Sequence, residues 1–173
     1  VYAHPNPKSF NHAILSQVEA NLKCDNKEYI VRDLYSLNFN SRLDGSDFVA
    51  IQNGQTPKDI ATEQSYIKNA DTIIFIHPMW WFSMPALLKG YVDRVFSKGF
   101  AYDYDATGLK GLLPGKNVVI LNTTGGDEAT YTNYGFKDAL KKTIEAGTFE
   151  LCGMKVALHK YFHAVPTVSN DVR

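Results

Sequence analysis

Between residues 72 and 82 the chain reads TIIFIHPMWWF, and this stretch decides how the rest of the sequence is interpreted. Its first half, Thr72–Ile76, is an almost unbroken run of β-branched and aromatic residues. Such a run is typical of a parallel strand that is covered on both faces. The apolar residues from Met84 to Phe96 then recur at helical spacing, with Ser83 as the expected N-cap. A buried strand followed by an amphipathic helix predicts a parallel α/β sheet.

The loop between this strand and this helix carries three consecutive aromatic residues, which are costly to expose to water. Open α/β sheets bind their ligands at the carboxyl ends of the strands, where this loop lies. Two interpretations of the stretch remain open at this point. The loop forms an apolar wall for a flat ligand, or it closes the core or a dimer contact.

Strand and helix patterns alternate along the rest of the chain. We expect strands within residues 1–3, 28–34, 71–77, 117–122 and 155–162, and helices within residues 10–22, 59–70, 84–96 and 136–151. Residues 44–53 are ambiguous and are consistent with a short helix, and residues 97–115 are expected to form a long functional loop. The prediction is one domain, residues 1–173, with a doubly wound parallel sheet in a three-layer α/β sandwich. The natural protein is expected to extend beyond both ends of the chain.

The composition excludes several classes of protein. Lys+Arg and Asp+Glu both number 18, so the formal net charge is zero. The chain therefore has neither the net positive charge that would attract nucleic acid nor the net negative charge that would dock a basic redox partner. No apolar run is long enough to span a bilayer. The two cysteines, Cys24 and Cys152, lack a CxxC pattern and are expected to be reduced, buried thiols in a cytoplasmic protein. None of the five histidines has metal-ligand spacing, so no metal site is predicted.

Three unusual loops follow strands of the predicted sheet, so they are expected to share one crevice. The loop from His4 to Ser9 leads into a helix N-terminus, which favours an anion. The second loop is the aromatic stretch, and the third, Thr123–Gly126, offers two hydroxyls and two glycines beside a ring edge. A phosphate site, an aromatic wall and a glycine-rich edge together favour a flavin. Each feature alone has a simpler explanation, as a helix cap, a core loop or a turn.

Other nucleotide-binding motifs are absent from the sequence. There is no GxGxxG after the first predicted strand and no GxxxxGK[ST], which argues against a dinucleotide-binding Rossmann domain and a P-loop enzyme.

Four stretches resemble the flavodoxin-like NAD(P)H:quinone oxidoreductases: VYAHPNPKSFNHA, HPMWWFSMPALLKGYVDRVF, GFAYDYDATGLKGLLPGK and NTTGGDEATYTNYG. Within that family the chain resembles bacterial general-stress quinone reductases and the flavoprotein subunits of glutathione-gated potassium efflux systems. The resemblance implies a five-stranded flavodoxin-like sheet, bound FMN or FAD, and a homodimer with its sites at the interface. It also implies a ping-pong reaction that moves a hydride from NAD(P)H to a quinone.

The resemblance also assigns roles to residues. Those implied to bind the flavin phosphate and ribityl chain are His4, Ser9, Phe10 and Asn11. Those implied to line the ring are Pro78, Met79, Trp80, Trp81 and Phe82, and those at its pyrimidine edge are Thr123, Thr124, Gly125 and Gly126. Tyr131 matches a tyrosine that stabilises charge on the reduced ring, whereas the histidine expected six residues later is replaced by Lys137. Asp93 is interpreted as a surface partner of Lys89.

Three functions remain under consideration. The leading hypothesis is a flavin-dependent NAD(P)H:quinone reductase that acts on quinone-like small molecules. It is expected to be a cytoplasmic homodimer, and no nucleic-acid partner is expected. The second is a regulatory subunit that docks on a membrane transporter, and the third is a one-electron flavodoxin carrier. The third ranks last because such carriers dock through strong acidic charge, which this neutral chain lacks. The motifs serve FMN or FAD, and the choice between NADH and NADPH depends on a cation near the 2′-phosphate that the sequence does not locate.

Overall fold

A computed structural model of the chain describes residues 1–169 and 171. Its α-helices are α1 (Phe10–Cys24), α2 (Gly45–Gln52), α3 (Lys58–Asn69), α4 (Ala86–Val95), α5 (Glu128–Asn133) and α6 (Phe136–Leu140). The strands are β1 (Thr72–Pro78), β2 (Tyr102–Asp105), β3 (Gly108–Gly111), β4 (Asn117–Thr123) and β5 (Lys155–Phe162). Helix α6 continues into a π-helix, η1 (Lys141–Phe149), and a 3₁₀ turn, η2 (Glu150–Cys152). Residues 170, 172 and 173 of the predicted domain lie outside the described part.

The central sheet is parallel, with the strand order β1-β4-β5. It continues past β1 only through isolated parallel bridges, in which Tyr2 pairs with Ile76 on one side and with Asp33 on the other. The predicted parallel α/β sheet is therefore confirmed. The expectation of five strands is wrong, because the sheet has three strands flanked by single bridges.

Residues 1–3 and 28–34 take part in the sheet through few contacts. The Val1 amino group donates a hydrogen bond to the Ile74 carbonyl at 2.7 Å, and Tyr2 bridges to Ile76 and to Asp33. The strands predicted at residues 1–3 and 28–34 are therefore each reduced to isolated bridges.

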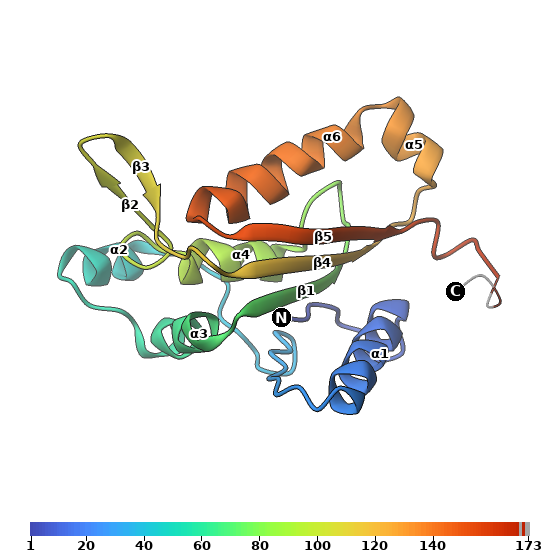
Figure 1. The fold of residues 1–173 in the computed structure, drawn as a ribbon, viewed down its shortest axis with the longest axis horizontal. Helices are drawn as coiled ribbons and strands as arrows, with labels where there is room; N and C mark the ends of the chain where they lie inside the picture. The colour runs from blue at the N-terminus through green and yellow to red at the C-terminus, as the bar shows by residue number, and fades with distance from the viewer. Residues whose placement is uncertain (170, 172–173) are drawn as a thin grey trace.

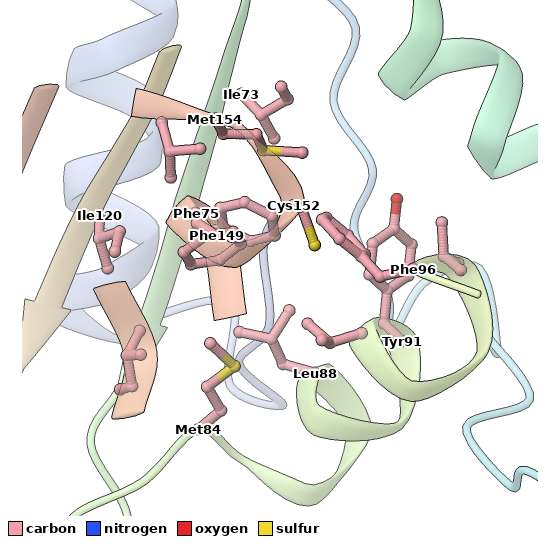
Figure 2. Close-up of a cluster of buried hydrophobic side chains, with 14 of the residues drawn as sticks. Ile73, Phe75, Met84, Leu88, Tyr91, Phe96, Ile120, Phe149, Cys152 and Met154 are labelled. Atoms are coloured by element: carbon pink, nitrogen blue, oxygen red, sulfur yellow. The ribbon is translucent and has the colours of Figure 1, made fainter. Parts of the chain in front are cut away.

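Two hydrophobic clusters cover the two faces of the sheet, as alternation along buried strands requires. On one face, Phe75 and Ile120 pack against α4 and η1, and the ring centroids of Phe75 and Phe149 are 4.8 Å apart (Figure 2). On the other face, Ile76 and Leu121 contact α1. Figure 1 shows α1 and α6 on opposite sides of the sheet, which gives the three layers that the sequence predicts.

Local corrections to the sequence predictions are few. The N-cap of α4 is Pro85, because Ser83 is held in a bridge with Trp80. The expected long loop at residues 97–115 contains the β2–β3 hairpin. Cys24 is exposed, since it ends α1, whereas Cys152 is buried as expected. In the part of the chain that the structure covers, no helix is both long and apolar enough to cross a bilayer.

Candidate functional site

The three loops that the sequence singles out meet at the carboxyl ends of β1 and β4, and Thr123 joins them. The Asn11 side-chain amide donates to Thr123 Oγ1 at 2.7 Å, which ties the start of α1 to the glycine-rich loop. The Met79 N–H donates to the Thr123 carbonyl at 2.7 Å and ties in the aromatic loop. The His4 and Trp80 rings lie 6.1 Å apart, so the first two loops also touch.

The first loop ends in a free helix N-terminus. Ser9 is the N-cap of α1, and its Oγ accepts a hydrogen bond from His12 N at 3.2 Å. The N–H groups of Phe10 and Asn11 make no hydrogen bond with the described residues, as expected for the first helical turn. The Phe10 ring packs edge-on against Phe162 at 5.7 Å and fixes the helix to the end of β5. His4 contributes Nδ1 as an acceptor for Asn6 N, and partial burial lowers its pKa.

Asn11 carries an unsatisfied polar atom inside the site. The residue is 2% exposed, and its Oδ1 has no hydrogen-bond partner among the described residues. Buried polar atoms without partners are rare in folded proteins and call for an explanation. The two ends of an amide group are interchangeable by a 180° rotation. In the rotated form Oδ1 accepts the Thr123 hydroxyl proton, and the amide N–H group is free to bind an anionic ligand.

The aromatic loop forms a tight turn with a strained backbone. Trp80 and Ser83 exchange two backbone hydrogen bonds of 3.1 Å, and Trp81 and Phe82 between them have φ values of 51° and 53°. Positive φ at both central positions is the geometry that usually requires Asn-Gly, and such strain concentrates at functional sites. Trp81 is 96% exposed. By contrast, Pro78 and the side chain of Met79 are buried.

The glycine-rich loop presents free backbone donors. Thr124 is fixed by its N–H to the Phe162 carbonyl and by its hydroxyl to the Gly126 carbonyl, at 2.9 and 2.8 Å. The N–H groups of Gly125 and Gly126 make no hydrogen bond with the described residues. A side chain at Gly125 would meet nothing within 4 Å, so the space beside this loop is open.

Tyr131, in α5, lies directly behind this loop. Its ring is 5.3 Å from Phe82, and a Cβ at Gly126 would approach it to 3.5 Å. Burial raises the pKa of its phenol, so the group is neutral at pH 7 and its hydroxyl is a donor. Lys137 lies 3.6 Å from Glu128 in an exposed ion pair, and Asp93 pairs with Lys89 at 2.5 Å as expected.

Sequence reasoning missed two groups of the site. His163 directly follows β5, and its ring lies 5.2 Å from the Tyr131 ring. His77, the sixth residue of β1, is fully buried and accepts a hydrogen bond at Nε2 from the Asn122 amide at 2.9 Å. His163 follows a strand, as the three loops do, but a single histidine does not make a loop sequence unusual.

Comparison with known proteins agrees with this architecture. A family model described as a flavodoxin-like fold matches residues 1–172. A Haemophilus influenzae protein named as an uncharacterized NAD(P)H oxidoreductase is 34% identical over all of this chain and 86% of its own. The human ribosyldihydronicotinamide dehydrogenase [quinone] is 33% identical, over all of this chain and 84% of its own.

A solved structure gives the same result in three dimensions. The NAD(P)H:quinone oxidoreductase from Methanothermobacter marburgensis superimposes with a TM-score of 0.85 at 27% identity, over 99% of this chain and 86% of that one. The chain therefore belongs to the flavodoxin-like family, among relatives named as NAD(P)H and quinone oxidoreductases.

Proposed function

We propose that the protein is a flavin-dependent oxidoreductase that transfers a hydride from NAD(P)H to quinones or related acceptors. The observation that carries the proposal is the joining of three loops through Thr123 at one edge of the sheet. The names of the relatives, which include an NAD(P)H oxidoreductase and two quinone-dependent enzymes, support the choice of reaction. FMN or FAD would supply the chemistry when bound, since a flavin accepts a hydride and passes it on.

The residues present fit such a ligand. The free N–H groups of Phe10 and Asn11, the rotated Asn11 amide and the helix dipole of α1 would hold a phosphate. His4 and Ser9 border this position, and Trp80, Trp81 and Phe82 would cover the flat ring system. Met79 and Pro78 would contribute backbone rather than side chain, because both side chains are buried.

The pyrimidine edge of the ring would face the glycine-rich loop. There the N–H groups of Gly125 and Gly126 are fixed in advance, so they stabilise negative charge without reorganisation. Thr123 and Thr124 hold the loop in place, and the neutral phenol of Tyr131 is available as a further donor.

We further propose a single domain that acts as a cytoplasmic homodimer, as the resemblance implies. The neutral charge and the absence of a basic field argue against a nucleic-acid partner. No observation favours a transporter subunit or a one-electron carrier, and none of the relatives reported above carries such a name.

Anaerobic absorbance spectroscopy tests the proposal. Protein reconstituted with FMN or FAD and then mixed with NADPH or NADH should lose the flavin absorbance band within seconds and regain it when a quinone is added. A bound flavin that neither nicotinamide reduces would exclude the enzyme, and failure to bind either flavin would exclude the site.

Trp81→Ala should weaken flavin binding by about tenfold, because stacking of a flat ring on an aromatic side chain contributes about 1–3 kcal/mol. Trp81 is 96% exposed, so its loss removes contact with a ligand and little internal packing. Quenching of flavin fluorescence on titration with protein measures the dissociation constant. Phe48→Ala, which removes another exposed aromatic ring from α2, is the matched control and should leave the constant unchanged. Equal affinity of Trp81→Ala and wild type would show that Trp81 does not cover the ring.

A further inference from the structure

His163 is a second titratable group at the glycine-rich edge of the site, beside Tyr131. It follows β5 directly, and the rings of His163 and Tyr131 lie 5.2 Å apart. On its other side the ring stacks on Tyr161, with centroids 5.6 Å apart and planes 10° apart. Two aromatic neighbours therefore fix the plane of the imidazole.

A short hydrogen-bond chain favours one protonated nitrogen on the ring of His163. Thr124 Oγ1 donates to the Gly126 carbonyl at 2.8 Å, the shorter of its two contacts. The same oxygen lies 3.1 Å from His163 Nδ1, and while its proton points to Gly126 it accepts there, which places the hydrogen of the neutral ring on Nδ1. The neutral ring then has its free lone pair at Nε2, which makes no hydrogen bond with the described residues. His163 is thus arranged to receive one proton, at Nε2.

The surroundings of His163 are balanced in charge. Asp127 and Glu128 at the start of α5 favour the charged imidazolium, and Lys137 in α6 and Lys160 in β5 oppose it. Tyr131 and Tyr161 are neutral near pH 7, because burial raises the pKa of both phenols. Burial dominates for His163 and lowers its pKa below 6.5, so the ring is neutral at pH 7. Added negative charge beside the ring would raise that pKa again.

We propose that His163 is the proton-accepting group of the site, taking up one proton at Nε2 when a hydride brings negative charge to the glycine-rich edge. This inference rests on the proposed function. A hydride carries two electrons and one proton, so its arrival from NAD(P)H adds one negative charge, which one proton from water on His163 compensates. A quinone needs one hydride and one proton to become a hydroquinone, so the proton on His163 is released in the second half-reaction. The sum is NAD(P)H, one proton and quinone giving NAD(P)⁺ and hydroquinone.

The neighbouring groups fit this role less well. Lys137 is about half exposed, and its ammonium group is already in an ion pair with Glu128. Tyr131 has no hydrogen-bond acceptor among the described residues, and its raised pKa leaves it protonated throughout. Among these three neighbours, His163 combines a ring held by two aromatic contacts, a ring nitrogen without a hydrogen bond to the described residues, and a side chain that titrates in the physiological range.

The pH dependence of the flavin midpoint potential tests the inference. The potential of a two-electron couple shifts by about 30 mV per pH unit for each proton that is taken up. In His163→Asn, the amide N–H replaces Nδ1–H toward Thr124 but the titrating nitrogen is lost. Between pH 6.5 and 7.5 the slope for this variant should therefore be about 30 mV per pH unit smaller than for wild type. Lys137→Gln is the matched control and should keep the wild-type slope.

Each outcome is distinct. A slope in His163→Asn equal to that of wild type would overturn the inference while leaving the proposed function intact, and so would a reduced slope in Lys137→Gln alone. A wild-type protein that binds no flavin would overturn the proposed function instead. His163→Gln, which moves the amide to the Nε2 end, provides a second test if the asparagine variant binds flavin poorly.

A measurement on the flavin-free protein is independent of activity. Imidazole ¹⁵N NMR should show the Nδ1–H tautomer of His163 at pH 7.5, with a midpoint below 6.5 on titration. Thr124→Val removes the acceptor at Nδ1 and should shift the population toward the Nε2–H tautomer. A wild-type protein with the Nε2–H tautomer would contradict the assignment of the accepting nitrogen.

Discussion

Replacing Arg94 by alanine is expected to lower the free energy of unfolding by about 3–5 kcal/mol, the usual cost of breaking a buried ion pair. Arg94, in α4, is 5% exposed and forms two hydrogen bonds with Asp47 of α2, at 2.8 and 3.0 Å. It also donates to the Asn40 carbonyl at 2.8 Å and to Asp59 of α3 at 2.5 Å. The variant leaves the Asp47 carboxylate, 3% exposed, without its counter-ion. Urea unfolding monitored by circular dichroism measures the loss.

Two further variants separate charge burial from ordinary loss of contacts. Lys89→Ala, which breaks the exposed pair with Asp93 on the same helix, should cost about 0.5 kcal/mol or less. The double variant Arg94→Met with Asp47→Leu should recover much of the lost stability, because apolar residues can replace a buried pair at little cost. If the double variant is as unstable as Arg94→Ala, the damage comes from lost packing rather than from an unpaired carboxylate.

The ion pair at Arg94 illustrates what the sequence could not predict about the fold. Strands β1 and β4 could be predicted, because a continuous apolar run needs no knowledge of its partners. Arg94 and Asp47 are 47 residues apart, and each is a charged residue that the sequence alone would place on the solvent-exposed face of its helix. The β2–β3 hairpin was hidden for a similar reason, since its burial pattern is mostly exposed and gives no alternation to detect.

In the site, too, some features could be predicted from the sequence and others could not. The loops were predictable, because each follows a strand and carries unusual residues, and Asn11 and Thr123 of two of these loops are in contact. The hydrogen bond that joins Asn11 to Thr123 spans 112 residues and depends on the closed sheet. His163 was missed because a histidine after the last strand has no local pattern that separates it from an ordinary loop residue. The role proposed for it rests on its contacts with Thr124 and Tyr131, which no local sequence pattern shows.

Acidification should destabilise the flavin-free protein by about 3 kcal/mol through His77 alone. The ring is fully buried at the end of β1, and burial lowers its pKa from 6.5 to about 4. The folded protein therefore keeps His77 neutral while the unfolded chain binds a proton below pH 6.5, so stability is lost as the pH falls from 6.5 to 4. A difference of about 2.5 pKa units corresponds to about 3 kcal/mol. Urea unfolding at pH 7.5 and at pH 4.5 measures most of this loss.

The physical reason is the full burial of the ring, which makes its charged form costly. The Asn122 amide nitrogen lies 2.9 Å from His77 Nε2, and Asn122 Oδ1 lies 2.6 Å from His159 Nε2. His77→Gln places a side chain that does not titrate beside Asn122, and its stability should therefore fall by about 2.5 kcal/mol less between the two pH values. The control His12→Gln, in α1 and outside this network, should keep the wild-type fall. An equal fall in His77→Gln and wild type would move the acid-sensitive group to His159 or His163, whose pKa values burial also lowers.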